Sequence, residues 1–364
     1  MSYRVKVIGA GSIGNHLTNA ARRMGWSVDM LDLDPAALKR TREQIYPSRY
    51  GAWDEKIGLY EAKDAPVGGY DLICIGTPPD SHIPLALKAV EERPRAILVE
   101  KPVCTPDLAG AQALHERCGE LGIKAFTGYD HVVGKAARRF AELLVAGAIG
   151  QTQTLDVEFR EYWGGIFAAH PWLSGPSDSY LGYWRRGGGA CGEHSHAINL
   201  WQAFAHAGGF GRVAEVTGTL EYVNDGVIDY DSLCLLNVKT ETGLIGRVVQ
   251  DVVTKPTRKW ARAQGTVGAL EWVCGSKPGQ DTVIQKLENG EATEVNVQKT
   301  RPDDFVEELR HIEAVLTGAV EVSPISLERG LESMMVVAAA HKSAAEKRTV
   351  SIDYTKGFRP EALV

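Results

Sequence analysis

The N-terminal segment contains the pattern that most constrains the fold of this chain. An apolar run at residues 5–8 is followed by Gly9-Ala10-Gly11-Ser12-Ile13-Gly14, a helix-like stretch at 16–24 and a second apolar run at 28–32. In such a strand–turn–helix unit, the first glycine permits a tight turn, the second lets backbone N–H groups approach a phosphate, and the third brings helix against strand. The helix N-terminus then faces the anion. We therefore predict a dinucleotide-binding unit whose contacts include Gly9, Gly11, Ser12, Ile13 and Gly14.

Asp32 ends the second apolar run, about twenty residues past the glycines, where a carboxylate can hold the ribose hydroxyls of the cofactor. Asp34 is the weaker candidate, because Asp34-Pro35 is typical of a helix N-cap followed by proline at the first helical position. A carboxylate at Asp32 would repel a 2′-phosphate, and no arginine follows it directly. We therefore expect NAD as the cofactor in preference to NADP.

Length, charge and cysteine spacing restrict the class of protein. A chain of 364 residues is too long for one ordinary core, so we expect two domains. The formal net charge of −6 provides no general basic surface for nucleic acid or an anionic membrane. No apolar stretch approaches the roughly twenty residues that cross a bilayer, and the first strand begins too early for a secretory signal. With six cysteines that lack C-x-x-C spacing, we expect a cytoplasmic protein with no nucleic-acid or membrane partner.

Strand and helix patterns alternate up to residue 127, which predicts a parallel sheet with helices on both faces. The segment 46–69 has room for a further short strand that the pattern does not place. The expected strands are residues 5–8, 28–32, 70–75, 96–99 and 124–127, with helices starting at Ile13, Pro35, Ile83 and Pro106.

After Gly128 the pattern changes to period-two alternation. Leu155, Val157 and Phe159 alternate with polar residues, as in a half-buried antiparallel strand. We expect the last two helices to cover this sheet or to dock on the first domain. The further expected strands are residues 213–222, 233–238, 244–253, 269–273 and 283–287, and the expected helices are 136–146, 305–316 and 325–345.

Polar residues follow two predicted strands at the carboxyl edge of the parallel sheet, where ligands of open α/β folds bind. The first set, residues 76–82, is either a proline-stiffened turn with Ser81 capping a helix or a rigid wall beside the cofactor, and both can hold. The second is Glu100-Lys101-Pro102. Lys101 is either an ordinary surface lysine or a group that donates to a substrate oxygen as hydride leaves, and we favour the second. Expected cofactor contacts at this edge are Thr77, Pro78, His82, Glu100 and Lys101.

In the second half of the chain, a glycine triplet at residues 187–189 is expected to form a flexible turn that leads into a helix-like segment. Glu193, His196 and Asn199 recur at three-residue spacing and would share one helical face. His196 is a candidate acid/base partner of Lys101, with Glu193 or Asn199 orienting the substrate or the imidazole; the alternative is a capping or core histidine. Metal ligation is a third possibility. We expect none, because His194 and His196 would point to different helix faces and no second Glu-x-x-His occurs.

The order of these motifs resembles that of the Gfo/Idh/MocA oxidoreductases over essentially the full chain. The motifs are the glycine turn, Asp32, Thr77-Pro78-Pro79, Glu100-Lys101-Pro102, Gly128-Tyr129 and residues 187–196. The resemblance implies an α/β fold with a Rossmann dinucleotide-binding domain in residues 1–128. It also implies a substrate-binding and oligomerisation α/β domain in residues 129–364, with a large, mostly antiparallel open sheet.

The same resemblance implies NAD(P)-dependent hydride transfer to or from a secondary hydroxyl, or its ketone, of a sugar, sugar acid or cyclitol. The catalytic lysine falls on Lys101 and the catalytic histidine on His196. The acidic residue falls on Glu193, three positions before the histidine and not the usual four, which leaves its role open. Second-rank candidates for substrate or cofactor contact are Tyr129, Tyr180 and Arg186, and the segments His170-Pro171-Trp172 and Ser179-Tyr180 either shape the pocket or only pack.

Two other functions remain open at this point. One is a glycoside-cleaving enzyme that uses tightly held NAD for transient oxidation, and the other is a regulatory protein that senses the cofactor. The presence of both Lys101 and His196 argues against the regulatory role. We also expect a homodimer or homotetramer through the C-terminal sheet, because an exposed apolar sheet face is seldom left bare.

Overall fold

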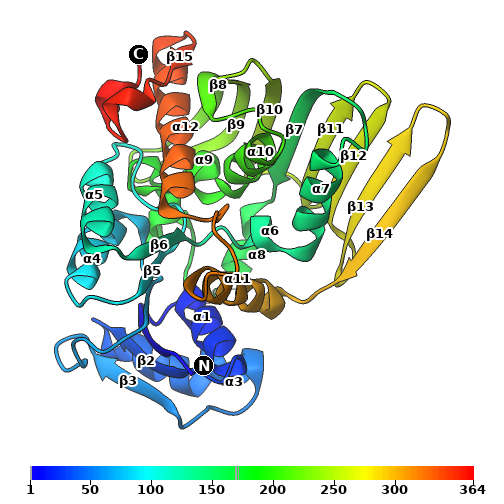
Figure 1. Cartoon of the computed structure of the whole chain (residues 1–364). Coiled ribbons are helices and arrows are strands. Elements are labelled where there is room, and N and C mark those ends of the chain that lie inside the picture. The colour runs from blue at the N-terminus through cyan, green and yellow to red at the C-terminus, as the bar shows by residue number, and fades with distance from the viewer. Residues whose placement is uncertain (1, 169, 171) are drawn as a thin grey trace. The chain divides into compact units, whose positions relative to one another are not determined.

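The computed structural model describes residues 2–168, 170 and 172–364 and divides into two compact units (Figure 1). The first unit comprises Met1–Cys104, Gly110–Asp130 and Arg301–Glu328. The second comprises Thr105–Ala109, His131–Thr300 and Arg329–Val364. Each unit is therefore built from segments that are distant in the sequence, and each contains one sheet.

The sheet of the first unit has six parallel strands in the order β3-β2-β1-β4-β5-β6. This is the strand order of the Rossmann fold, in which successive strands are added on one side of β1 up to β3 and on its other side from β4 onward. The strand that the sequence left unplaced is β3. The strands are β1 (Arg4–Ile8), β2 (Ser27–Asp32), β3 (Ile57–Glu61), β4 (Leu72–Ile75), β5 (Ala96–Val99) and β6 (Lys124–Thr127).

The helices of this unit agree with the sequence patterns except at one point. The helix expected from Pro106 begins only at Ala111, because Leu108 and Gly110 have positive φ angles of 58° and 72°, which end any helix there. Helix α11 packs beside α1 (Figure 1), where His16 stacks on Phe305 with ring centroids 4.6 Å apart. The helices are α1 (Ser12–Arg23), α2 (Pro35–Arg40), the π-helical turn η1 (Thr41–Ile45), α3 (Tyr46–Tyr50), η2 (Pro79–Ser81), α4 (His82–Val90), α5 (Ala111–Leu121) and α11 (Arg301–Leu316).

The sheet of the second unit has nine strands in the order β14-β13-β12-β11-β7-β10-β9-β8-β15. Its neighbours pair antiparallel except β7 and β10, so the expected mostly antiparallel sheet is confirmed, although β7 itself has one parallel neighbour. The strands are β7 (Thr152–Arg160), β8 (Val213–Asn224), β9 (Asp229–Thr240), β10 (Ile245–Asp251), β11 (Arg258–Gly265), β12 (Gly268–Lys277), β13 (Gln280–Leu287), β14 (Ala292–Gln298) and β15 (Val350–Ser351).

Helices cover one face of this sheet. Leu155, Val157 and Phe159 of β7 are buried on that face, as their alternation predicted. Helix α10 contacts β7 and β10, α7 contacts β12 and β13, and the amide of Gly218 in β8 donates to Ser343 of α12. The remaining helices of the chain are α6 (Asp130–Val133), α7 (Lys135–Val145), α8 (Trp163–Ala168), α9 (Gly189–Glu193), α10 (His196–Ala207) and α12 (Leu327–Glu346). The 3-10 turns are η3 (Pro176–Asp178), η4 (Tyr180–Gly182), η5 (Trp184–Arg186), η6 (Tyr354–Lys356) and η7 (Pro360–Ala362).

The opposite face of the sheet differs from the expectation of an apolar surface. Exposed apolar side chains such as Leu235 and Ile245 alternate there with charged residues. Cross-strand ion pairs bridge neighbouring strands, namely Arg247–Asp156, Arg262–Glu271 and Lys239–Glu215. The open face is therefore not the bare apolar surface from which a homodimer or homotetramer was expected. Among the described residues, no helix has both the length and the apolar character needed to cross a membrane.

Candidate functional site

Three glycines shape the turn between β1 and α1. Gly9 has a φ of +106°, and a Cβ there would lie 2.8 Å from the carbonyl oxygen of Gly76. A Cβ at Gly14 would lie 1.9 Å from the carbonyl oxygen of Gly9, whereas a Cβ at Gly11 would meet nothing within 4 Å. Gly9 and Gly14 are thus needed for the tight turn and the helix–strand approach, and Gly11 borders open space before Ser12 begins α1. The turn fits the pyrophosphate of a dinucleotide.

The carboxylate of Asp32 is held at the end of β2 by two backbone amides. The N–H of Ala10 donates to its Oδ2 at 2.7 Å, and the N–H of Asp34 donates to its Oδ1 at 2.9 Å. The side chain of Asp34 caps α2 by accepting from the N–H of Ala36 at 2.9 Å, as predicted. Asp32 is therefore the carboxylate that lies at the glycine turn, in the position from which ribose hydroxyls are bound in this fold.

The turn after β4 is stiffened by side-chain hydrogen bonds. The hydroxyls of Thr77 and Ser81 are 2.7 Å apart, and Ser81 Oγ donates to the carbonyl of Pro78 at 2.7 Å. The expectation that the Ser81 side chain caps the next helix was wrong, since its hydroxyl turns back into the turn. The structure thus supports a rigid turn at this edge of the sheet.

His82 joins this turn to the one after β5. Its Nε2 lies 2.6 Å from the carbonyl oxygen of Thr77 and its Nδ1 lies 2.9 Å from that of Pro102. The imidazole is fully buried, and burial lowers its pKa to about 4. The imidazole ring of His82 therefore lies between the two turns that carry the candidate cofactor contacts.

Glu100 and Lys101 directly follow β5. The Glu100 side chain is 5% exposed and lies against Gly128, where a Cβ would come 2.6 Å from the carboxylate. Its Oε2 accepts from the backbone N–H of Lys101 at 3.3 Å. Burial, then the charge of Asp130, raises the pKa of Glu100 to about 8. Glu100 thus orients the backbone of Lys101, whose side chain is only partly buried.

Helix α11 adds a buried carboxyl group to this region of the first unit. Glu308 is fully buried, and neither of its carboxyl oxygens has a hydrogen-bond partner among the described residues. Burial, and then the charge of Glu100, raises the pKa of Glu308 well above its usual range. Nearby, Arg301 pairs with Asp130 at 2.7 Å. These residues were not predicted from the sequence, because no local pattern relates positions 301–308 to Glu100.

The segment that carries Glu193 and His196 is two helices and not one. Glu193 ends α9 and His196 begins α10. Between them, the N–H of Ser195 bonds to the carbonyl of Gly192 and that of Ala197 to the carbonyl of His194, each three residues back. These tightened turns break the regular helix, so the expectation that Glu193, His196 and Asn199 share one continuous face was wrong, as was the argument about the faces of His194 and His196.

The glycine triplet permits close packing around α9. Gly189 has a φ of +75°, and a Cβ there would lie 1.9 Å from Oδ1 of Asp231. The other oxygen of this buried carboxylate accepts from the N–H of Cys191 at 2.6 Å. A Cβ at Gly188 would lie 2.1 Å from the carbonyl oxygen of Tyr180. The triplet, expected to be a flexible turn, is instead held tightly against β9 and η4.

The remaining predicted residues are divided between the two units. The hydroxyl of Tyr180 donates to Glu193 Oε2 at 2.8 Å, which ties η4 to α9. The guanidinium of Arg186 lies 5.7 Å from the ring centre of Tyr183. In the segment 170–172, the rings of His170 and Trp172 meet edge to face, and Pro171 lies outside the described residues. Tyr129, in the first unit, is fully buried.

His196 lies in an aromatic setting within the second unit. Its ring stacks at 6.1 Å on Phe159, and the ring of His131 meets it edge-on at 4.8 Å. Trp272 packs on Phe159 from β12, with ring centroids 6.0 Å apart. The sequence analysis did not single out His131, although it lies four residues after the last strand of the parallel sheet, where functional side chains gather.

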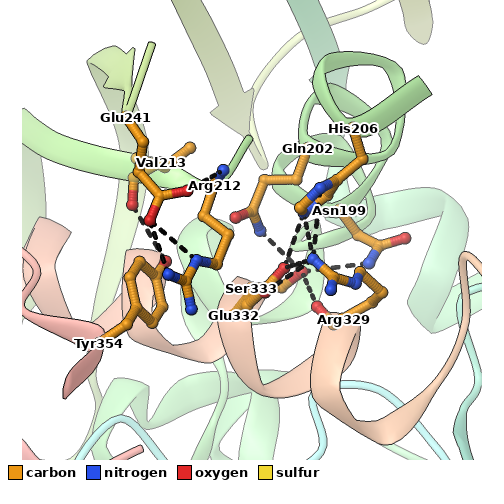
Figure 2. A network of polar contacts seen from close by, with 10 residues as sticks. All are labelled: Asn199, Gln202, His206, Arg212, Val213, Glu241, Arg329, Glu332, Ser333 and Tyr354. Atoms are coloured by element: carbon orange, nitrogen blue, oxygen red, sulfur yellow. Dashed lines mark hydrogen bonds and ion pairs between the residues drawn. The ribbon is translucent and has the colours of Figure 1, made fainter. Parts of the chain in front are cut away.

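Asn199 anchors α10 to α12 in a polar network (Figure 2). Its Nδ2 and the Nε2 of Gln202 both donate to the hydroxyl of Ser333, at 3.1 and 3.2 Å. One turn further, His206 Nε2 lies 2.9 Å from the buried carboxylate of Glu332. The amide of Asn199 is 1% exposed, so this side chain fixes the helix that begins with His196.

A parallel sheet of this strand order, with a glycine turn and a carboxylate at the end of β2, is typical of a dinucleotide-binding domain, and comparison with protein families agrees. Residues 3–129 match the family model described as "Oxidoreductase family, NAD-binding Rossmann fold". The matching model is that of the Gfo/Idh/MocA oxidoreductases, the family that the order of the motifs resembles. NAD is the cofactor class of this family domain.

Solved structures resemble the chain over nearly its whole length. An oxidoreductase from Agrobacterium radiobacter, crystallised with NAD+, L-tartaric acid and magnesium, is 21% identical, with a TM-score of 0.76 over 96% of this chain and 98% of that one. A putative myo-inositol dehydrogenase from Sinorhizobium meliloti is 20% identical (TM-score 0.72, 96% and 99% covered). An aldose-aldose oxidoreductase from Caulobacter crescentus is 18% identical (TM-score 0.76, 97% and 100% covered). At these identities the likeness establishes the fold. None of the curated proteins compared matches the sequence.

Proposed function

We propose that this protein is an NAD-dependent dehydrogenase that oxidises a secondary hydroxyl of a sugar, sugar acid or cyclitol, or reduces the corresponding ketone. The observation that carries the proposal is the arrangement within the first unit. Asp32 is fixed to the glycine turn at the end of β2, and Lys101 follows β5 at the same carboxyl edge of the sheet. Cofactor anchor and candidate reacting group are thus on one rigid sheet.

The residues of the glycine turn fit the cofactor, with Gly9, Gly11, Ser12, Ile13 and Gly14 around the pyrophosphate and Asp32 at the ribose. When bound, the nicotinamide supplies the hydride acceptor. The chain must then manage the hydroxyl group, whose oxygen gains negative charge as the C–H hydride leaves. The ammonium of Lys101 donates a hydrogen bond to that oxygen and so stabilises the charge where it develops.

His196 is proposed as the group that takes up the hydroxyl proton, because a neutral imidazole is a suitable base near pH 7. Its support in the second unit is consistent with a fixed role, since Asn199 anchors α10 and Asp231 anchors α9. Glu193 is bound by Tyr180 and is proposed to hold the loop beside α9. If His196 is the base, the pH profile of kcat for oxidation should lose one ionisation in His196→Gln.

Cofactor choice and substrate class are further parts of the proposal. The carboxylate of Asp32 favours NAD over NADP, because a 2′-phosphate would be repelled. The substrate class is supported by the enzymes of similar structure. They include a putative myo-inositol dehydrogenase and a levoglucosan dehydrogenase solved with NADH and L-sorbose. A panel of sugars, uronic acids, hydroxy acids and inositols, scored by NADH formation, tests the proposal. Release of reducing sugar without net NADH would favour a glycosidase, and binding of NAD without any turnover would favour a sensor.

We also propose that the open face of the nine-stranded sheet pairs two copies of the chain. Its mixture of exposed apolar side chains and ion pairs is compatible with a polar, self-complementary interface. Leu235→Arg on that face should shift the mass measured by light scattering toward the monomer. Val145→Arg, at an exposed position of α7, is the control and should leave the mass unchanged.

A further inference from the structure

The helical segment after β2 packs against the glycine turn, although no sequence motif marks it. Helix α2 runs through the π-helical turn η1 into α3. At the start of η1, the hydroxyl of Thr41 donates to the carbonyl of Ala10 at 2.8 Å and accepts from Asn15 Nδ2 at 3.0 Å. Asn15 also donates to the carbonyl of Gly11 at 2.8 Å. The segment thus fixes the carbonyl side of the turn, at Ala10 and Gly11.

Arg49 extends from α3 to the first turn of α1. Its Nη1 lies 2.8 Å from Oγ and 3.4 Å from the carbonyl oxygen of Ser12. Ser12 follows Gly11, beside the open space that a Cβ at Gly11 would face. The adjacent Tyr50 places its hydroxyl 2.6 Å from Nδ1 of His16, one helical turn further along α1. These two contacts hold α3, and with it the guanidinium, at the N-terminal end of α1.

The charges around the turn make this position significant. Residues 9–15 contain no lysine or arginine, so the glycine turn itself provides only N–H groups and the helix N-terminus, equivalent to about half a charge. A pyrophosphate carries two negative charges at neutral pH. A guanidinium donates two parallel hydrogen bonds to phosphate oxygens, which no ammonium group can do.

We propose that Arg49 is a phosphate-binding residue of this site, which donates from its guanidinium to the pyrophosphate while Ser12 Oγ completes the contact. The inference rests on the proposed binding of NAD at the glycine turn and extends it to a residue outside that turn. In this arrangement, η1 and α3 form a second wall of the pyrophosphate site, and the contact with Ser12 aims the guanidinium before the ligand arrives.

The test compares ligands that differ in the pyrophosphate. Equilibrium dissociation constants for NAD+, ADP-ribose and adenosine are measured by calorimetry on the full-length protein and on Arg49→Gln. Loss of a charge-assisted hydrogen-bond pair should weaken NAD+ and ADP-ribose by roughly 10- to 100-fold and leave adenosine unchanged. Arg49→Lys should recover part of the loss, because it keeps the charge without the paired geometry.

Arg42→Gln is the matched control. Arg42 lies on the same helical segment, but it is exposed and paired with Glu55 at 3.1 Å, so its removal should change none of the three constants. Equal weakening of adenosine and ADP-ribose by Arg49→Gln would overturn the inference, as would unchanged binding of NAD+. NADP+ is titrated in parallel, and a larger loss of affinity for NADP+ than for NAD+ would assign Arg49 to a 2′-phosphate instead. If the unsubstituted protein binds no NAD+, the proposed function itself fails, and the two failures are thereby distinguished.

Discussion

The backbone N–H of Ala10, inside the glycine turn, donates to Oδ2 of Asp32 at 2.7 Å. This bond joins two features that the sequence presents separately, the glycine turn and the carboxylate at the end of β2. Because both oxygens of Asp32 accept from backbone amides, the side chain is oriented before a cofactor binds. Preorganisation of this kind reduces the entropy lost on binding.

Asp32→Ala should therefore weaken NAD+ by roughly 10- to 100-fold, since a hydrogen-bonded charge is removed from the ribose site. It should also narrow the difference between NAD+ and NADP+, because the repulsion of the 2′-phosphate is lost. Dissociation constants for both cofactors provide the measurement. Asp34→Ala is the control: it should cost about 1 kcal/mol of stability as a lost helix cap but leave the ratio of the two affinities unchanged.

Gly128→Ala should destabilise the first unit by roughly 1–3 kcal/mol, because the added methyl group collides with the buried carboxyl of Glu100. Turnover should fall as well, since Glu100 orients the backbone of Lys101. Gly119→Ala, on the exposed side of α5 with nothing within 4 Å of the new Cβ, should be neutral or stabilising. Urea unfolding measures the free energy of unfolding of both variants. Equal stability of Gly128→Ala and Gly119→Ala would show that the Glu100 side chain moves aside freely.

The raised pKa values of Glu100 and Glu308 predict that the stability of the protein depends on pH. Both carboxyl groups have pKa values raised in the folded protein, Glu100 to about 8, above the 4.5 of an unperturbed glutamate. Between these values the folded state holds more protons than the unfolded state, so the free energy of unfolding falls as pH rises from about 5 to 8, by up to about 1.4 kcal/mol per pH unit for one group.

Glu308→Gln keeps the shape of the side chain and removes its titration. Its thermal midpoint should therefore decline less steeply between pH 5 and 9 than that of the unsubstituted protein. The same scan of Glu307→Gln, on the more exposed side of α11, should follow the unsubstituted curve. A decline of the same slope in Glu308→Gln would mean that Glu308 is already ionised at the lower pH.

Ser333→Ala should leave the buried amides of Asn199 and Gln202 without an acceptor and cost about 1–3 kcal/mol of stability. Because this contact lies in the second unit, NAD+ affinity should be unchanged while turnover declines through α10 and His196. Calorimetric NAD+ titration beside a turnover assay separates the two effects. Parallel loss of both would point to global unfolding.

The parts of the fold that the sequence predicted are those with a local physical cause. The glycine turn, the Asp34 cap and the alternation of β7 each follow from neighbouring residues, and the structure confirms them. Strands β11 and β14 were missed because β11 buries only small alanines between charged residues and β14 is exposed at nearly every position. Neither strand has the apolar alternation by which half-buried strands are recognised.

The candidate site depends more on contacts between distant segments, which a single sequence does not reveal. Arg49 contacts Ser12 at the start of α1, and Glu308 is buried where the charge of Glu100 affects it. Neither residue lies in a recognisable sequence motif. The break between α9 and α10 depends on backbone hydrogen bonds that span three residues and not the four of an α-helix. Glu193, His196 and Asn199 were assumed to lie on one regular helix, so this break was not predicted. The glycine triplet was interpreted as flexible because its real cause, the buried carboxylate of Asp231, lies on another strand.

We propose that Lys101 acts on the substrate oxygen and contributes little to the binding of NAD+. The most direct measurement compares Lys101→Ala with the unsubstituted protein, using the best substrate of the polyol panel and the dissociation constant of NAD+. The account predicts that kcat falls by at least roughly 100-fold, as for loss of a general acid/base or charge-stabilising group, while NAD+ affinity changes less than about threefold. Unchanged kcat, or an equal loss of NAD+ affinity, would contradict it.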